Sequence, residues 1–415
     1  MKHAILGVAA VVCVGLGAVT FHALAASEFS PPPDEQLRPL GEWEGRRRLV
    51  MVLHADPPHS TEGVQGLRAI RKAYLDVIKA ALPLVNVTVI TPLSVDALDF
   101  ANWIHKEGLG KELRAGRLAL ESFAVDSVWI RDYNVLLARG ESSGFLYGID
   151  PVYAQNAAEK DRFYDDRMAY WLFRNSSIRW IRPPLYLDGG NFDTDAEGLC
   201  FTSTETLGYN QAARGEMTEV FRRWLGCRDT VFLEPIPAES TGHLDMFFKV
   251  LSPDHWVLGQ YSPKKELREP MDYLEYLAHT AMEKNAGTLQ AVLEKRKKGR
   301  LIRMDMPRPH LFNHYDWDPT EWDLPRNERQ PASPLGKEEH YKRQVGFASY
   351  VNSVYLKGAR GEVVIVPSYV TDQRDAQAVA IYREAYPHAK VIRMPSDYLI
   401  QDEGAAHCVL YAMPE

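Results

Sequence analysis

The sequence predicts a single α/β domain built from one repeated unit, and two observations support this prediction. Apolar stretches with a helical period alternate with short apolar stretches of strand length along most of the chain. Several of the strand-like stretches end in a short polar motif, so that a helix–strand–motif unit recurs about five times. Repetition on this scale is typical of stacked or radially arranged supersecondary units. We therefore expect one domain whose polar motifs converge.

The individual elements follow from local periodicity. In the helix predicted for residues 61–84, Ile70, Tyr74 and Ile78 recur every four residues on one face. Short apolar runs such as residues 49–53 are typical of buried strands. The predicted helices cover residues 61–84, 162–173, 211–225, 272–297 and 373–385, and the predicted strands cover residues 49–53, 85–91, 118–123, 178–181, 230–233, 301–304 and 390–393.

The first residues have the features of an export signal. Lys2 gives a positive start, residues 4–21 are apolar, and Ala-Leu-Ala at 23–25 fits a cleavage site. The apolar run approaches spanning length, so an uncleaved membrane anchor is the alternative, although its Ala, Gly and Val content makes it a poor anchor. We expect residues 1–25 to be a cleaved signal peptide, and the mature protein to be periplasmic or secreted without stable membrane insertion.

The rest of the chain divides by composition. Three consecutive prolines mark residues 26–47 as an N-terminal arm or linker. Residues 48–415 contain no further linker and are expected to form the domain. Within it, residues 307–340 carry six prolines and no periodicity, which predicts a long irregular loop. Its tryptophans and acidic residues either receive a cationic peptide or pack beneath an ordinary surface loop.

Charge and cysteine content narrow the function. The net charge of −7 gives no basic field for nucleic acid and favours cationic substrates. Without residues 1–25 the chain keeps Cys200, Cys227 and Cys408, and an odd cysteine in an exported protein indicates a thiol that can be reactive. Cys200 and Cys227 either form a disulfide or are small buried hydrophobic residues.

Three polar motifs supply the chemistry that a Cys408 nucleophile needs. His243 and Asp245 lie two residues apart, so in an extended segment they point to the same side, and the histidine can carry a proton. Asp132, in Trp-Ile-Arg-Asp, and Asp188, in Asp-Gly-Gly-Asn, add carboxylates after predicted strands. Each motif alone has a plain structural reading, as a core histidine or a turn aspartate. No other histidine or cysteine cluster has metal-ligand spacing, so we expect no metal and no cofactor.

Taken in order with Ser-Tyr-Val-Asn at 349–352 and the late His407-Cys408, these motifs resemble the bacterial peptidylarginine deiminase and agmatine deiminase family. That family belongs to the guanidino-group-modifying superfamily. The resemblance extends from about residue 49 to residue 408. It implies a five-bladed α/β propeller, with pseudo-fivefold ββαβ-type units in a single domain.

The resemblance also implies a mechanism. Asp132 and Asp245 hold the planar, cationic guanidinium through charge-assisted hydrogen bonds and aim its carbon at Cys408. Attack by Cys408, with His243 as the proton carrier, releases ammonia and leaves a covalent thiouronium that water converts to a ureido group. Five further positions match residues that the family uses around its substrate: Trp129, Arg131, Asp188, Asn191 and Asn352.

The substrate is less clearly indicated, because several positions depart from the family pattern. Tyr133-Asn134 stand where members usually have Gly-Pro, and Asp188 stands where agmatine deiminases often have Glu. Residues 149–161 lack the arginine pair that holds a C-terminal carboxylate in the bacterial peptidylarginine enzymes. Because of export we expect arginine in peptides or proteins as the substrate, with agmatine or free arginine as the alternative. An amidinotransferase and a catalytically silent guanidinium-binding protein are the remaining hypotheses.

Overall fold

The computed structural model describes residues 29–53, 63–92, 97–154, 162–314, 342–369 and 373–415. The predicted signal peptide at 1–25 and most of the predicted loop at 307–340 lie outside the described residues. Within the described ranges, no helix combines the length and apolarity that crossing a membrane requires.

Five sheets repeat one pattern of strand pairing. In each of them a first strand pairs antiparallel with a second, and the second pairs parallel with a third. Parallel neighbours need a crossover connection, and helices supply it in every unit. The α/β class predicted from the sequence is therefore confirmed.

The five units have the following bounds. The first contains β5 (Leu136–Gly140), β6 (Leu146–Ile149), α5 (Asp165–Phe173) and β7 (Arg179–Ile181). The second contains β8 (Asp193–Thr194), β9 (Leu199–Ser203), α6 (Glu205–Tyr209), α7 (Arg214–Trp224) and β10 (Asp229–Leu233). The third contains β11 (Phe248–Ser252), β12 (His255–Gln260), α8 (Pro270–Arg296) and β13 (Arg300–Asp305). The fourth contains β16 (Val354–Gly358), β17 (Gly361–Ser368), α9 (Asp375–Ala385) and β18 (Ala389–Pro395). The fifth contains β19 (Leu410–Pro414), β2 (Arg47–Val52), α1 (Gly63–Ala81) and β3 (Val87–Pro92), followed by α2 (Ala97–Lys106), α3 (Gly110–Arg114) and β4 (Leu118–Phe123).

The predicted repeat is present, but its closure is not shown. Among the described residues the strands form separate sheets, and none of these sheets closes on itself. The five-bladed propeller implied by the family resemblance thus stays a prediction.

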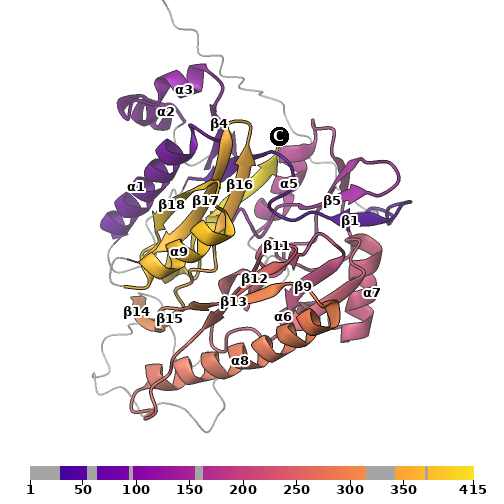
Figure 1. The fold of residues 1–415 in the computed structure, drawn as a ribbon. Coiled ribbons are helices and arrows are strands. Elements are labelled where there is room, and N and C mark those ends of the chain that lie inside the picture. Colours follow the sequence, from indigo (N-terminus) through magenta and orange to yellow (C-terminus); the bar gives the residue numbers. More distant parts are fainter. Residues whose placement is uncertain (1–28, 54–62, 93–96, 155–161, 315–341, 370–372) are drawn as a thin grey trace, which may run out of the picture.

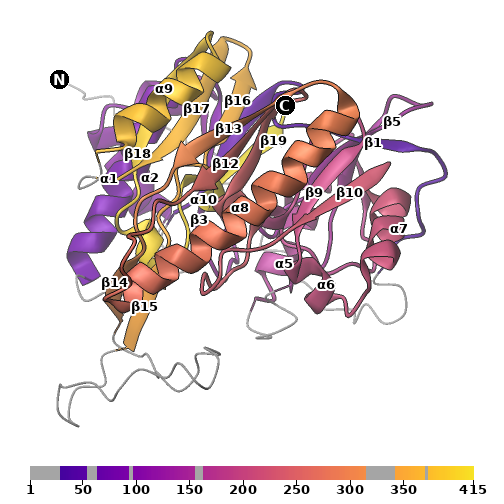
Figure 2. The same ribbon diagram turned by 60° about the horizontal axis from the view of Figure 1, so that its bottom comes forward.

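The helices lie around the outside of the sheets, as both views show for α1, α8 and α9 (Figures 1 and 2). Tyr74 and Ile78 of α1 are almost fully buried, in one apolar cluster that also contains Val89 of β3 and Ile392 of β18. One helix face therefore packs against two neighbouring sheets, which explains why its apolar stripe is so regular. Burial of this kind joins each unit to the next.

The predicted arm at residues 26–47 needs correction. Strand β1 (Leu37–Pro39) pairs antiparallel with β5, so this stretch extends the first sheet to four strands. Leu37 is buried there, and Glu42 reaches the interior. Residues 37–47 are therefore part of the folded domain. The prolines before them led to the prediction of a linker where a short edge strand follows.

The predicted loop also starts later than expected. Strand β14 (His310–His314) pairs antiparallel with β15 (Lys342–Gly346) and forms a separate hairpin. Residues 310–314 are therefore not irregular, although proline residues flank them. Residues 315–340 of the predicted loop lie outside the described residues.

The question about Cys200 and Cys227 is settled by the structure. The two residues form a disulfide that joins β9 to the turn after α7, with a sequence separation of 27 residues. Cys408 is the free cysteine within the described residues, and it is buried.

All five polar motifs occupy the same place in their units. Each lies directly before the first strand of a unit: residues 129–132 before β5, 188–191 before β8, 243–245 before β11, 349–352 before β16 and 407–408 before β19. Because the repeat places equivalent connections alike, motifs that are far apart in sequence can meet.

Candidate active site

The candidate nucleophile lies in the short helix α10 (Ala406–Val409), just before β19. Cys408 is only 4% exposed, and its sulfur accepts a hydrogen bond from the Asn352 side-chain amide at 3.2 Å. Asp245 Oδ2 lies 3.9 Å from the same sulfur. Burial, and after it the Asp245 and Asp132 carboxylates, raise the pKa of the Cys408 thiol well above its ordinary value.

His243 is held by two carboxylates. Its Nε2 lies 3.0 Å from Asp188 Oδ2, and its Nδ1 lies 3.6 Å from Asp132 Oδ1. Burial by itself lowers the pKa of His243, but Asp132, Asp188 and Asp245 outweigh it and raise the pKa to about 10. In the absence of a ligand this imidazole is therefore protonated at neutral pH and can donate a proton.

Asp132 and Asp245 are both buried and both point into the same region. Asp132 Oδ1 accepts a hydrogen bond from the Gly190 amide at 3.1 Å, and burial raises the pKa of this carboxyl group. Asp245 Oδ1 is buried and has no hydrogen-bond partner among the described residues. A buried carboxylate oxygen without a donor is costly, so this atom marks where a cationic donor would bind.

Gly190 lies where these side chains meet. It belongs to a single 3₁₀ turn, Gly189–Asn191, between β7 and β8. A Cβ atom built on it would lie 2.7 Å from Asp132 Oδ1, 2.9 Å from His243 Nδ1 and 3.1 Å from Asp245 Oδ2. Only glycine leaves the room that this convergence requires. The structure thus brings the four predicted catalytic residues, Cys408, His243, Asp245 and Asp132, into one buried site.

The five residues predicted around the substrate make contacts that hold the site together. Asp188 contacts His243 with one oxygen and accepts the Ala154 amide at 2.8 Å with the other. Asn191 is engaged on both sides of its amide, by Ser203 N at 3.0 Å and Thr206 Oγ1 at 3.1 Å. Asp188 and Asn191 therefore stabilise the geometry of the turns that carry the chemistry.

The remaining three have different surroundings. Asn352 holds the Cys408 sulfur and, through its Oδ1, the amide of His407 at 2.8 Å. The Trp129 ring packs against Gly404, where any Cβ would overlap the indole. Arg131 Nη2 pairs with Glu42 at 2.9 Å, and the Arg131 backbone amide donates to the Cys408 carbonyl oxygen at 3.1 Å.

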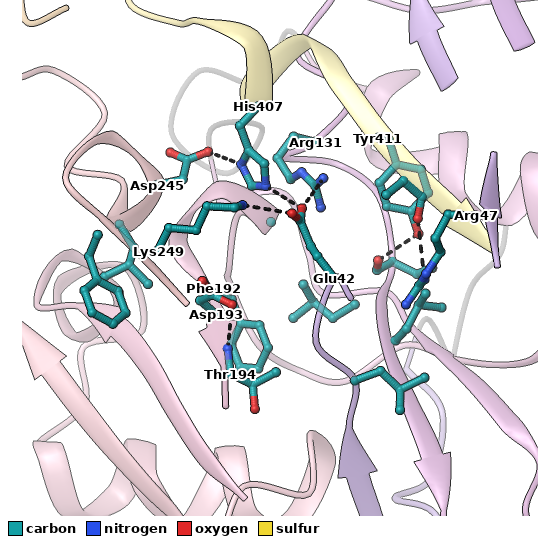
Figure 3. Close-up of a pocket in the computed structure, with 18 residues that line it drawn as sticks. Glu42, Arg47, Arg131, Phe192, Asp193, Thr194, Asp245, Lys249, His407 and Tyr411 are labelled. Atoms are coloured by element: carbon teal, nitrogen blue, oxygen red, sulfur yellow. Dashed lines mark hydrogen bonds and ion pairs between the residues drawn. The ribbon is translucent and has the colours of Figure 1, made fainter. Parts of the chain in front are cut away.

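Sequence reasoning missed a buried charge cluster behind the site. A cavity of about 60 Å³ lies against Asp245 and His407, but Cys408, His243 and Asp132 do not line it. In Figure 3 Glu42 lies at its centre, with its carboxylate between His407, Lys249 and Arg131. A lysine inside the buried strand Phe248–Ser252 was the available signal, because lysine is almost never fully buried unless it is paired.

Within the ranges that the structure describes, no group of three or more His, Cys, Asp or Glu side chains is arranged to hold a metal ion.

Comparison with known proteins identifies the family. The family model for Porphyromonas-type peptidyl-arginine deiminases matches residues 38–414. The chain belongs to this family. The predicted enzyme class, a hydrolase of C–N bonds in linear amidines, is thereby confirmed.

The individual proteins that the chain resembles are distant in sequence. The agmatine deiminase of Pseudomonas aeruginosa is 23% identical over 403 residues, which cover 93% of this chain and 97% of that protein. The solved agmatine deiminase of C. jejuni has a TM-score of 0.68 at 18% identity, covering 94% of this chain and 99% of the other. The agmatine deiminase of Enterococcus faecalis has a TM-score of 0.65 at 16% identity, covering 92% and 96%. At these identities the structural matches support the fold.

Proposed function

We propose that this protein is an agmatine deiminase, which hydrolyses the guanidino group of a small substrate to a ureido group and releases ammonia. The observation that carries the proposal is the convergence of Cys408, His243, Asp132 and Asp245 around the bare backbone of Gly190. Two buried carboxylates beside a thiol and a protonated imidazole fit a planar cation that must be attacked at its carbon.

In the first half-reaction, Asp132 and Asp245 bind the guanidinium nitrogens. The bound positive charge offsets the two carboxylates that raise the pKa of the Cys408 thiol, so the thiol releases its proton to solvent and the thiolate forms. The sulfur then forms a bond to the guanidinium carbon, and one C–N bond breaks. His243 donates its proton to the departing nitrogen, which leaves as ammonia, and a thiouronium remains on Cys408.

In the second half-reaction, neutral His243 takes a proton from a water molecule. The water oxygen bonds to the thiouronium carbon, the C–S bond breaks, and the second proton of the water passes to the departing sulfur as the ureido product leaves. The Cys408 sulfur and the His243 imidazolium are thereby restored. The carboxylate of Asp188, 3.0 Å from Nε2, supports the charged form of the ring in both steps.

Three observations favour agmatine over arginine in a peptide, which export had led us to expect. Relatives that match nine-tenths of the chain are described as agmatine deiminases. Residues 149–161 lack the arginine pair that would hold a C-terminal carboxylate. Glu239 accepts the amide of Gly242, next to His243, at 2.7 Å, and burial and the nearby Glu403 carboxylate raise its pKa to about 7, so a second acidic pair lies near His243. Such a pair suits the primary ammonium that agmatine carries and an internal peptide arginine lacks.

We further propose that the protein is exported, with residues 1–25 removed. The Cys200–Cys227 disulfide supports this, because disulfides persist mainly in oxidising compartments. Mass spectrometry of the protein from its native compartment measures the N-terminus. A mature chain that starts near residue 26 supports the proposal, and an intact residue 1 contradicts it.

The decisive experiment measures ammonia release from agmatine, free arginine, a peptide with internal arginine and a peptide ending in arginine. The matched control is Cys408→Ala. We expect agmatine to be turned over fastest, and Glu239→Gln to raise the KM for agmatine at least about tenfold while changing it little for the internal-arginine peptide. Faster ammonia release from a peptide would indicate that the substrate is arginine in peptides. Turnover only with an added amine acceptor would indicate an amidinotransferase, and binding without turnover a silent guanidinium-binding protein.

A further inference from the structure

Glu42, whose side chain is largely buried, connects to the candidate active site through contacts that the mechanism above does not use. Its carboxylate pairs with Lys249 Nζ at 2.9 Å and with Arg131 Nη2 at 2.9 Å, and accepts the Tyr355 amide at 3.3 Å. The same carboxylate lies 2.8 Å from His407 Nε2. Four separate segments of the chain therefore converge on one side chain.

These segments are the ones that carry the predicted chemistry. Arg131 precedes Asp132, Lys249 follows Asp245 by four residues, and His407 precedes Cys408. Tyr355 follows Asn352, the donor to the Cys408 sulfur, by three residues. The partners of Glu42 thus include a residue close in sequence to Asp132, one close to Asp245 and one next to Cys408.

The contact through His407 has a chemical consequence for Asp245. His407 Nδ1 lies 2.5 Å from Asp245 Oδ2, which leaves Oδ1 as the buried oxygen without a partner. Figure 3 shows this chain of contacts running from Glu42 through the His407 ring to Asp245. Since one oxygen is fixed by the histidine, the other is directed to the substrate.

The charge of His407 is linked to the same contacts with Glu42 and Asp245. Both ring nitrogens of His407 face carboxylate oxygens, so two N–H donors are needed, and only the imidazolium has both. Burial, Arg131 and Lys249 outweigh Glu42 and Asp245 and lower the pKa of His407 on balance, so the charged ring depends on its contacts with these two carboxylates. Glu42 is itself held as a carboxylate, because Lys249, His407 and Arg131 together outweigh burial and keep its pKa well below the usual value.

We propose that Glu42 is a positioning residue that acts through His407 to orient the guanidinium-binding carboxylate of Asp245. The inference rests on the proposed deiminase function and adds to it a residue outside the reacting groups. It also assigns a role to the segment that sequence analysis treated as an arm.

The test compares Glu42→Gln with Glu44→Gln in the full chain. Glu44 lies in the same turn and carries the same charge, but its side chain pairs with Arg38 and has no contact with His407. We expect Glu42→Gln to lower kcat/KM for agmatine between about 10- and 100-fold, because a misdirected contact of this kind costs that much. Glu44→Gln should stay within about twofold of the unchanged protein.

A double-mutant cycle with His407→Asn separates positioning from general damage. If Glu42 acts through His407, Glu42→Gln should cause no more than about a threefold further loss when His407→Asn is already present. If Glu42 only stabilises the fold, the two losses multiply, and the proposal is overturned. On the Cys408→Ala background, which binds agmatine without turnover, adding Glu42→Gln should raise the dissociation constant of agmatine. This measures the effect on the binding carboxylate of Asp245 directly.

A compensated double variant serves as the control for misfolding. Glu42→Gln leaves Lys249 buried and unpaired, so Glu42→Gln/Lys249→Met removes that cost if the single variant does not fold. The proposal expects this pair to fold but to keep the loss in kcat/KM, and full activity would overturn it.

If the unchanged protein turns over no guanidine at all, the proposed function fails, and this inference fails with it. If the unchanged protein is active and Glu42→Gln equals Glu44→Gln, only the inference fails.

Discussion

At the scale of single residues, the site depends on the lack of a side chain at Gly190. Gly190 leaves Asp132, His243 and Asp245 close to one another, and each would lie 2.7–3.1 Å from an added Cβ atom. Distances below about 3 Å force side chains to move, and a displaced carboxylate cannot hold a guanidinium in line with Cys408.

We therefore predict that Gly190→Ala lowers kcat/KM for agmatine at least about 100-fold. The matched control is Gly215→Ala in α7, where an added Cβ meets nothing within 4 Å. That change should leave activity unaltered and stabilise the helix by about 0.5–1 kcal/mol. Thermal melts and steady-state kinetics on both variants check this, and an active Gly190→Ala protein would show that the site is wider than described.

The raised pKa of the Cys408 thiol gives a prediction about pH. Because burial and the Asp245 and Asp132 carboxylates disfavour the thiolate, alkylation by neutral chloroacetamide should be slow at pH 7. Its rate should rise with pH and still be rising at about pH 9.5, since the thiolate fraction grows until the pH passes the raised pKa.

The amidinium analogue of this reagent tests the role of the carboxylates. Chloroacetamidine has the same shape but carries the positive charge that Asp132 and Asp245 are predicted to bind. It should alkylate Cys408 at least about tenfold faster than chloroacetamide at pH 7, and Asp245→Asn should abolish most of the difference. Mass spectrometry with Cys408→Ala as the blank identifies the modified residue. Equal rates for the two reagents would argue against a guanidinium site.

At the scale of elements, the disulfide fastens α7 to the sheet of its own unit. Cys200 lies in β9 and Cys227 lies just after α7, so the disulfide closes a loop with a sequence separation of 27 residues. Closing a loop of this length stabilises a fold by about 3–4 kcal/mol in the chain-entropy treatment. The bond lies in the apolar cluster with Phe221 rather than in the site.

We accordingly predict that Cys200→Ala/Cys227→Ala lowers the melting temperature by at least about 5 °C. Activity at 25 °C should remain within twofold, since none of the catalytic contacts involves these residues. A reducing agent should lower the melting temperature of the unchanged protein similarly and have no effect on the double variant. An unchanged melting temperature would mean that the bond contributes nothing to stability.

The elements also show which features of the fold were predictable. Helices such as α8 and crossover strands such as β13 were predicted to within two residues, because a long apolar period or a short apolar run carries their signal locally. Both antiparallel strands were missed in the first four units, and β19 was missed in the fifth. Strand β8 is only two residues long, and β5 ends in charged and small residues, so neither has a periodic pattern to recognise.

The site divides in the same way. Cys408, His243, Asp245 and Asp132 were predictable from family motifs, whose residue types alone suggest chemistry. Glu42 was not, since its partner His407 lies 365 residues away in sequence and no local pattern joins them. Long-range ion pairs inside a fold depend on topology, and topology entered the prediction only through the resemblance.

At the scale of the whole molecule, the two ends of the described chain meet in one sheet. Strand β19, directly after Cys408, pairs antiparallel with β2 through five residues. The sheet that carries the nucleophile is thus built from residues 47–123 together with residues 410–414. Glu42 reinforces the same junction from the interior, where it lies 2.8 Å from His407.

This arrangement predicts a sharp difference between two truncations. Removing residues 410–415 deletes buried Leu410 and Tyr411, each worth about 1.5–3 kcal/mol, together with the pairing to β2. The melting temperature should fall by at least about 5 °C, and turnover of agmatine should be lost because Cys408 loses its anchor. Removing Glu415 alone should shift the melting temperature by less than about 2 °C and leave activity intact, since its side chain only contacts Asn86 at the surface. If the longer truncation keeps both stability and turnover, α10 holds the nucleophile without β19. The contacts of Asn352 and Glu42 would then suffice to position Cys408.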